Sequence, residues 1–391
     1  MLFIPYAEIC TPENTAIQAC LREGTTLYAT GGTVLYQYDL SDPQSPQLIK
    51  TADLSAGHSG EADYIRRGGA HVTAIADLGE SLALSLRDSS GGVTNMEDGH
   101  IVGALSIVRK DTLEKVTELN FENKVTHVTR YRDLLIVSLH FHGFYVYKLT
   151  EDDRVLSCIY KYVEIEKPRR TSTREFQNSV IFEVEERKIH IAMASYAFGI
   201  NVYTYDLENN CLTPCGELNP KTVLPHMQDA PSAGKNKVFG LAAKGSFVYG
   251  GVSPGNNLFR EQYKDLNWDK LDHRGILYGP HDRLAEEHYH LPLPESDKPA
   301  FIGVIAGDPA PSFLCVAKDH LLFNLDKQGL GIAEIGADGK LTYVGRALED
   351  PEGRQLTHCL CFDGEFLYAS YKMPVADPQN PPVLRIYRVE A

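Results

Sequence analysis

The sequence predicts an all-β protein, a single seven-bladed β-propeller whose ring is closed by the N-terminal strand completing the last blade. Three features of the 391-residue chain predict this fold. A strand unit recurs seven times, the last copy stops after its third strand, and the composition suits one large buried core.

Each copy of the repeat contains an apolar first strand, a tight turn, a second strand rich in small residues and a third strand that often begins with glycine. In the first copy these strands begin at Ile17, Leu27 and Val34. We expect one domain over residues 1–391, with blades at 16–56, 71–121, 125–164, 178–220, 236–298, 311–351 and 356–391, the last completed by residues 1–10.

The two chain ends predict how the ring closes. The last copy ends at Ala391 after its third strand, and residues 1–6 are strand-like with no partner in their own copy. Pairing these segments would remove two exposed strand edges. A stack of β-sandwiches, whose strands recur at a similar spacing of about 8–12 residues, is the alternative fold.

Several third strands resemble the LVIVD-type propeller repeat, in which glycine leads an aromatic and aliphatic run. The nearest stretch is Leu135-Ile-Val-Ser-Leu139 followed by Gly143-Phe-Tyr-Val-Tyr147. This resemblance implies a propeller fold and implies no activity. The repeated signatures of sialidase, WD40 and Kelch propellers are missing from the sequence.

Composition excludes several classes of partner. A formal net charge of −14 argues against nucleic-acid binding, which depends on many lysines and arginines. No stretch approaches the roughly 20 apolar residues that span a bilayer, and residues 1–6 lack a secretory signal. We therefore expect a cytoplasmic protein with no membrane partner. The eight cysteines suit reduced apolar positions, and their two close pairs lack the second Cys/His pair of a zinc site.

Function is expected on the face of the propeller where first strands begin and second strands end. The strand register puts eight of the fourteen histidines on this face. The predicted set is His58, His71, His100, His127, His140, His142, His226 and His358, with Arg66, Arg67, Arg87, Arg174, Lys327, Lys372, Tyr64, Tyr196 and Tyr371. His190 and His320 fall at the opposite turns, where we expect a structural role.

Histidine, tyrosine and arginine together are the groups that an enzyme for an acidic sugar requires. We predict a carbohydrate-active enzyme that acts on a uronate-containing saccharide by β-elimination, and this chemistry is similar to that of propeller-fold polysaccharide lyases. The candidate catalytic residues are His140, His127, His358, Tyr371 and Tyr196. The candidate substrate-binding residues are Arg66, Arg67, His71, Arg87, Arg174, His226 and Lys327. No cofactor is certain, and a divalent metal held by His127, His140 and His358 is the candidate.

Other functions fit the same residues. A lactonase or an epimerase would use the same acid–base groups, and a metal-dependent hydrolase would need carboxylates such as Asp88, Asp98, Asp229 and Asp326. A non-catalytic propeller that binds a glycan or a protein is the alternative from a different class. The expected ligand is an anionic small molecule or oligosaccharide. Serine-hydrolase, phosphate-loop and dinucleotide-binding motifs are missing from the sequence.

Overall fold

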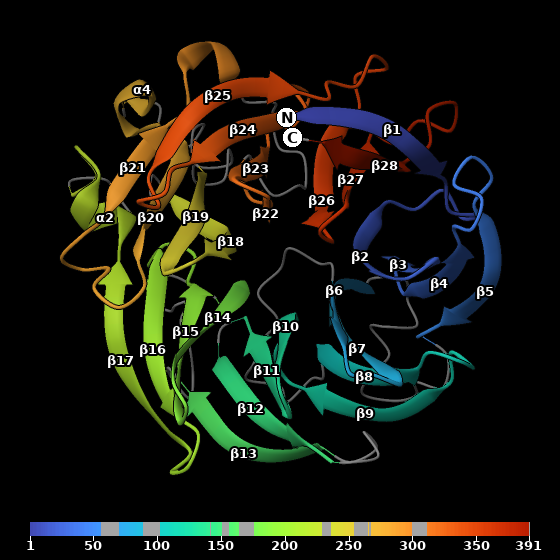
Figure 1. Cartoon of the computed structure of the whole chain (residues 1–391), viewed down its shortest axis with the longest axis horizontal. Coiled ribbons are helices and arrows are strands. Elements are labelled where there is room, and N and C mark those ends of the chain that lie inside the picture. The colour runs from blue at the N-terminus through green and yellow to red at the C-terminus, as the bar shows by residue number, and fades with distance from the viewer. Residues whose placement is uncertain are drawn as a thin grey trace. The chain divides into compact units, whose positions relative to one another are not determined.

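In the computed structural model, the chain folds into seven four-stranded antiparallel sheets (Figure 1). This arrangement confirms the predicted all-β, seven-bladed β-propeller. The structure describes residues 1–55, 70–88, 102–140, 142–150, 156–163, 176–228, 236–253, 265, 267–298 and 311–390. Two compact units divide the chain. The first is Met1–Phe176, Glu365–Ser370 and Asp377–Ala391, and the second is Gln177–Gly364 and Tyr371–Ala376.

The first unit contains three complete blades, with strand orders β2-β3-β4-β5, β6-β7-β8-β9 and β10-β11-β12-β13. Their strands are β2 (Ile17–Glu23), β3 (Thr26–Gly31), β4 (Val34–Asp39), β5 (Gln47–Asp53), β6 (Ala70–Asp77), β7 (Ser81–Asp88), β8 (Gly103–Arg109), β9 (Lys115–Phe121), β10 (Val125–Tyr131), β11 (Leu134–Leu139), β12 (Gly143–Leu149) and β13 (Leu156–Val163). Each blade therefore follows the chain from its first strand to its fourth.

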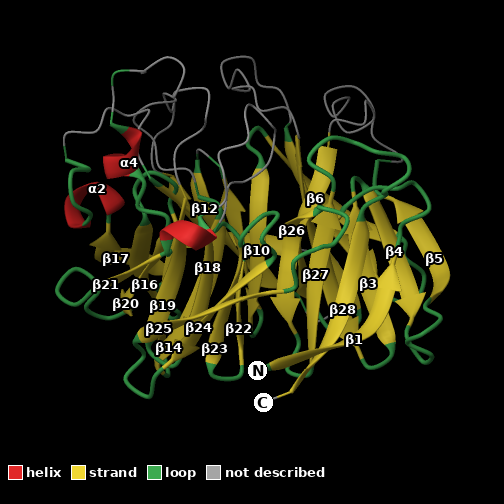
Figure 2. Ribbon diagram, turned by 90° about the horizontal axis from the view of Figure 1, so that it is seen from above, coloured by secondary structure: helices red, strands yellow, loops and turns green. Residues whose placement is uncertain are grey.

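The second unit repeats this order in the sheets β14-β15-β16-β17, β18-β19-β20-β21 and β22-β23-β24-β25. Their strands are β14 (Asn178–Glu185), β15 (Lys188–Ala194), β16 (Ile200–Asp206), β17 (Cys211–Leu218), β18 (Lys237–Lys244), β19 (Phe247–Ser253), β20 (Gly275–Pro280), β21 (Tyr289–Pro292), β22 (Leu314–Ala317), β23 (His320–Asn324), β24 (Leu330–Ile335) and β25 (Leu341–Ala347). Short helices α2 (Pro220–Val223) and α4 (Trp268–Leu271), red in Figure 2, and the 3-10 turn η4 (Glu295–Asp297) lie between these strands in the chain.

The seventh blade joins the two ends of the chain. Its strand order is β1-β28-β27-β26, formed by β1 (Leu2–Ile9), β28 (Val383–Glu390), β27 (Phe366–Lys372) and β26 (Gln355–Phe362). β1 pairs antiparallel with β28 from Leu2 opposite Glu390 to Ile9 opposite Leu384 (Figure 1). The Arg385 guanidinium binds the Glu8 carboxylate at 2.9 Å. The predicted closure by the N-terminal strand is thereby confirmed.

The apolar core lies between consecutive blades of each unit. Side chains from β16, β18, β19 and β20 form one such cluster, with Ile200, Val248 and Leu277 fully buried. Second strands carry small residues because the neighbouring blade approaches them closely: a Cβ on Gly250 would lie 2.8 Å from Ile200 Cδ1. Among the described residues, no helix is long and apolar enough to cross a membrane.

A one-residue β-bulge recurs in the fourth strand of several blades. In each case the pairing with the third strand skips one residue, which has no opposite partner. The skipped residues are Ile49, Val116, Ile159, Cys215, Val344 and, in β1, Tyr6. A bulge turns the side chain of the extra residue away from the ordinary alternation of the strand. Cys215 thus places a thiol at the bulge position that apolar or aromatic residues occupy in the other blades.

Removing residues 1–9 should test the closure. Without β1, the backbone of β28 loses its antiparallel partner and becomes an open edge. We expect the melting temperature to fall by roughly 10 °C or more, and we expect self-association in size-exclusion chromatography. Leu2→Ala, at a side chain that is 56% exposed, is the matched control and should melt like the unmodified protein. An unchanged melting temperature after the truncation would show that β1 does not hold the last blade.

Candidate functional site

Backbone hydrogen bonds tie the end of one blade's second strand to the start of the next blade's first strand. We call this edge of a blade, where the first strand begins and the second ends, its leading edge. The bonds are Val72 N to Gly32 O (2.9 Å), Phe176 N to His140 O (2.8 Å), Tyr196 N to Val238 O (3.2 Å), Val238 N to Tyr196 O (2.9 Å) and Leu356 N to Asp326 O (3.0 Å). Within each unit, the two sets of strand ends that the register predicts to meet are therefore joined.

Two of the residues in these bonds, Tyr196 and Asp326, have left-handed backbone conformations with φ of 54° and 52°. Glycine takes the equivalent place at Gly32, with φ of 58°. A non-glycine residue costs about 1–2 kcal/mol in this region. Such residues are found mainly where the surroundings hold them, and they cluster at functional sites. Tyr196 is a predicted acid–base residue and Asp326 a predicted carboxylate ligand.

Tyr196 is paired with a lysine across the gap between the fourth and fifth blades. The Lys237 ammonium donates a hydrogen bond to the Tyr196 hydroxyl oxygen and lies 3.9 Å from the centroid of the tyrosine ring. Phe239 packs edge-on against the same ring with centroids 5.1 Å apart. Lys237 is only 7% exposed. The contact thus places an ammonium beside a phenol, a group that can act as an acid or a base.

Asn236 immediately precedes Lys237 and is fully buried. Its side-chain amide donates to the carbonyl of Leu271 at 2.8 Å, at the end of α4. Its Oδ1 has no hydrogen-bond partner among the described residues. A buried carbonyl oxygen without a donor costs about 1–3 kcal/mol. The Asn236 side chain therefore belongs to the buried support of the strand that begins at Lys237.

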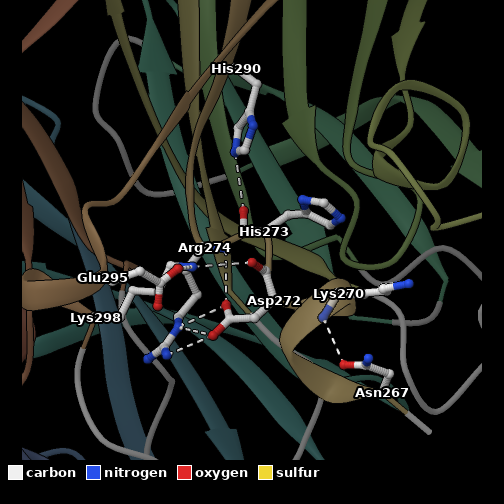
Figure 3. A network of polar contacts seen from close by, with 8 residues as sticks. All are labelled: Asn267, Lys270, Asp272, His273, Arg274, His290, Glu295 and Lys298. Carbon is white, nitrogen blue, oxygen red and sulfur yellow. Dashed lines mark hydrogen bonds and ion pairs between the residues drawn. The ribbon is translucent and has the colours of Figure 1, made fainter.

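A buried ion pair fixes the loop that supports Asn236. The Arg274 guanidinium binds both carboxylate oxygens of Asp272, the closest contact being 2.7 Å (Figure 3). Their side chains are 7% and 9% exposed. Burial alone would raise the pKa of Asp272, but the hydrogen bonds and charge of Arg274 outweigh burial and lower it. Lys298 adds a hydrogen bond to the Asp272 carbonyl at 3.4 Å.

Two histidines belong to the same network as structural groups. His290 Nε2 lies 3.1 Å from the carbonyl of His273 (Figure 3). His273 Nε2 lies 2.7 Å from the carbonyl of Pro225. Burial lowers the pKa of His290 to about 4 and lowers that of His273 as well. Both imidazoles are therefore neutral at neutral pH and donate to backbone carbonyls.

In the first unit, the structure brings together two predicted substrate-binding residues. His71 on β6 is directly opposite Arg87 on β7, and Arg87 Nε donates to His71 Nε2 at 3.1 Å. The acceptor nitrogen must carry a lone pair, so His71 is neutral in this contact. This pair presents an arginine at the leading edge of the second blade.

Three predicted histidines lie close together in the third blade. Burial lowers the pKa of His127 to about 4, and its Nδ1 lies 3.1 Å from Thr129 Oγ1. The backbone of His140 bonds both Lys124 and Phe176. His142 contacts Tyr145 edge-on, and burial lowers its pKa. The backbone of His140 is thus part of the joint between blades.

The remaining predicted residues differ in their surroundings. Tyr371 is fully buried, and its hydroxyl donates to the Leu348 carbonyl at 3.0 Å. His226 and Lys327 are exposed turn residues. The structure does not describe His58, Tyr64, Arg66, Arg67, His100 and Arg174, or the side chain of His358 in β26. Their predicted roles therefore stay predictions.

Sequence reasoning did not name Lys237, although the repeat contains a signal for it. Lys237 precedes Val238 as His71 precedes Val72, and both valines bond to the preceding blade through the same backbone contact. Residues at this place in the register lie at the leading edge. A search for polar residues just before the buried apolar residue of each first strand would have found Lys237.

Comparison with solved structures shows the fold alone. The β-propeller domain of Cps50 (Swd1) from Myceliophteria thermophila is similar over 100% of both chains, with a TM-score of 0.57 and 11% identity. U3-55K is similar over 98% of this chain and 100% of its own, with a TM-score of 0.56 and 9% identity. BamB from Moraxella catarrhalis is similar over 99% of this chain and 100% of its own, with a TM-score of 0.53 and 8% identity. No family model matches the chain, and no curated protein does.

Asp272→Asn should test the buried ion pair. The variant leaves the Arg274 charge buried without its counter-ion, so we expect a loss of about 3 kcal/mol in the free energy of unfolding at neutral pH. Because the pKa of Asp272 is lowered in the folded state, the ion pair stabilises above about pH 4. Its contribution disappears as the pH falls through the folded-state value.

Urea unfolding of both proteins at about pH 7 and about pH 3 measures this difference. The gap between the unmodified protein and the variant should be large at the higher pH and shrink at the lower. Asp269→Asn, at an exposed carboxylate in α4, is the control and should leave stability nearly unchanged. A gap that is equal at both pH values would mean that Asp272 is not ionised in the folded protein.

Proposed function

We propose that this propeller is a carbohydrate-active enzyme that cleaves an acidic, uronate-containing saccharide by β-elimination. Tyr196 is the acid–base group, and Lys237 binds the uronate carboxylate. The observation that carries the proposal is the contact between the Lys237 ammonium and the Tyr196 phenol oxygen at the leading edge of the fifth blade. The solved structures that resemble this chain contribute its fold and nothing of this activity.

β-Elimination on a uronate needs two kinds of group, and this pair supplies both. The C5 proton becomes acidic when a cation neutralises the adjacent carboxylate, and a base must remove that proton. The Lys237 ammonium has three hydrogens, so it can bond Tyr196 and still donate to a carboxylate. In this proposal Tyr196 starts as the phenolate beside the cation and takes the C5 proton.

One residue both takes up and returns the proton of this reaction. The C5–H and C4–O4 bonds break, a C4=C5 double bond forms, and the proton that Tyr196 takes from C5 is returned to the departing O4. No oxidant, reductant or net proton is required. The left-handed backbone of Tyr196 and the edge-on packing of Phe239 hold the ring in one orientation, which suits a group that acts twice.

The local charge also supports an anionic ligand. Although the chain carries a formal charge of −14, screening over about 8–10 Å separates one strand edge from the overall charge. Lys237 is nearly buried, so its attraction for a carboxylate is less screened than that of a surface lysine. Arg66, Arg67, Arg87, Arg174, His71, His226 and Lys327 stay predicted as further carboxylate-binding or positioning groups, and His127, His140 and His358 as candidate metal ligands.

A non-catalytic binding module is the second candidate function. Two of the predicted acid–base groups have partners within the protein, because Tyr371 donates to the Leu348 carbonyl and His127 Nδ1 lies 3.1 Å from Thr129 Oγ1. With fewer acid–base groups available, Lys237 and Tyr196 would bind an acidic glycan without transforming it. The same experiment separates the two functions.

Tyr196→Phe and Lys237→Met should have different effects on turnover and binding. Turnover of uronate oligosaccharides is followed by the ultraviolet absorbance of the unsaturated product, and binding by calorimetry. Loss of the phenol oxygen should lower kcat by about 10²–10⁴-fold with little change in affinity. Loss of the ammonium should weaken binding by roughly 10–100-fold, as expected for a hydrogen bond to a charged group.

The control is Lys244→Met, which removes an ammonium from the other end of the same strand, where it pairs with Asp319. This variant should bind and turn over like the unmodified protein. Binding of acidic but not neutral oligosaccharides without new absorbance would establish the binding module instead. If the unmodified protein binds no acidic saccharide, both functions are wrong for this site.

A further inference from the structure

A second cluster of reactive side chains lies in the fourth and fifth blades, at the strand ends opposite the leading edge. His190 on β15, Cys215 on β17 and His281 just after β20 form it, and we call it the thiol cluster. His190 Nδ1 lies 2.7 Å from His281 Nδ1, and His190 Nε2 lies 3.8 Å from Cys215 Sγ. His190 is thus bonded on one side to an imidazole and on the other to a thiol.

The cysteine of this cluster is exposed while its partners are not. Cys215 is exposed, whereas His190 and His281 are 6% and 8% exposed. Cys215 is also the bulge residue of its strand, at the place of Ile49, Val116, Ile159 and Val344 in other blades. The bulge therefore turns a thiol, rather than an apolar group, toward the start of the second strand.

The two histidines are held rigidly. His281 donates its backbone N–H to the Ser246 carbonyl at 2.9 Å, and its ring stacks on Phe182 with centroids 4.1 Å apart. Phe182 is directly opposite His190 in the pairing of β14 with β15. His281 can therefore orient the His190 ring and fix which nitrogen carries the proton.

The protonation states leave a neutral imidazole beside the thiol. Burial lowers the pKa of His281 to about 4 and also lowers that of His190, which the nearby Asp282 charge only partly offsets. Both rings are neutral at neutral pH. Since one Nδ1 must donate to the other, donation by His190 leaves the lone pair of its Nε2 directed at Cys215.

We propose that the thiol cluster is a thiol-modification site at which Cys215 reacts with low-molecular-weight disulfides, with His190 as general base and His281 as its positioning residue. The Cys215 sulfur attacks one sulfur of the disulfide as its proton passes to His190 Nε2. The S–S bond of the reagent breaks, a mixed disulfide forms on Cys215, and the released thiolate takes the proton from His190. This site is independent of the Tyr196–Lys237 pair.

Residue-resolved alkylation tests the base. The full-length native protein is treated briefly with iodoacetamide, and labelling of each cysteine is measured by peptide mass spectrometry. Cys211 is the internal control, because it is an exposed thiol on the same strand, paired across the sheet with Asp206. We expect Cys215 to react about tenfold faster than Cys211 or more. In denaturant, the two rates should become similar.

Three variants assign the roles. His190→Ala should bring the Cys215 rate down to that of Cys211, with the largest loss at mildly acidic pH, where thiols ionise least without a base. His281→Asn keeps a hydrogen-bond partner for His190 and should retain most of the rate, whereas His281→Phe keeps the stacking on Phe182 and should lose it. The buried Cys359 should stay unlabelled in each variant, which reports that the variant is folded.

Oxidised glutathione and cystamine then test the class of reagent. Mass spectrometry should find one added group on the Cys215 peptide, removed by reductant, before any addition at Cys211. Equal native rates at Cys215 and Cys211 would overturn the proposal without any variant. Fast alkylation with no mixed disulfide at Cys215 would overturn the assignment of the reagent.

Discussion

The backbone hydrogen bonds between consecutive blades are the constraint on which the rest of the structure depends. Where Tyr196 and Val238 exchange two such bonds, the chain must turn through a left-handed residue to continue into the third strand. The same contact carries Lys237 to the tyrosine hydroxyl. The geometry of the site is therefore a property of the joint between blades.

The same joint explains why the repeat could be read from the sequence. Tyr196 is followed by Gly199 and Asp326 by Gly329, both with positive φ, because the chain must pass the fourth strand closely. A Cβ on Gly199 would lie 2.1 Å from the Leu218 carbonyl oxygen. Glycine spacing and alternating apolar residues are local signals, so the strand limits and the closure of β1 on β28 could be predicted.

Partners of individual side chains could not be predicted in this way. The burial of Tyr371 depends on the Leu348 carbonyl, 23 residues earlier in the chain, and Lys237 meets Tyr196 from 41 residues away. His190 was expected to be structural, because the strand register puts it at the turns opposite the predicted site. Its contact with Cys215 depends on a bulge, which adds one residue and changes the face of the strand to which side chains point. No residue type marks that bulge, since Ile49, Val116 and Tyr6 occupy it elsewhere.

The fold and the proposed function therefore depend on different residues of this chain. Solved propellers at 8–11% identity share its architecture, which shows how little of the fold depends on particular side chains. Backbone bonds and alternating apolar residues support any residue at strand ends, provided that the interior of each joint stays apolar. The ends are free to vary, and here they hold a cation beside a phenol at one edge and neutral imidazoles beside a thiol at the other. The activity of such a protein has to be inferred from the residues at its strand ends, because proteins that share the fold can differ at those positions.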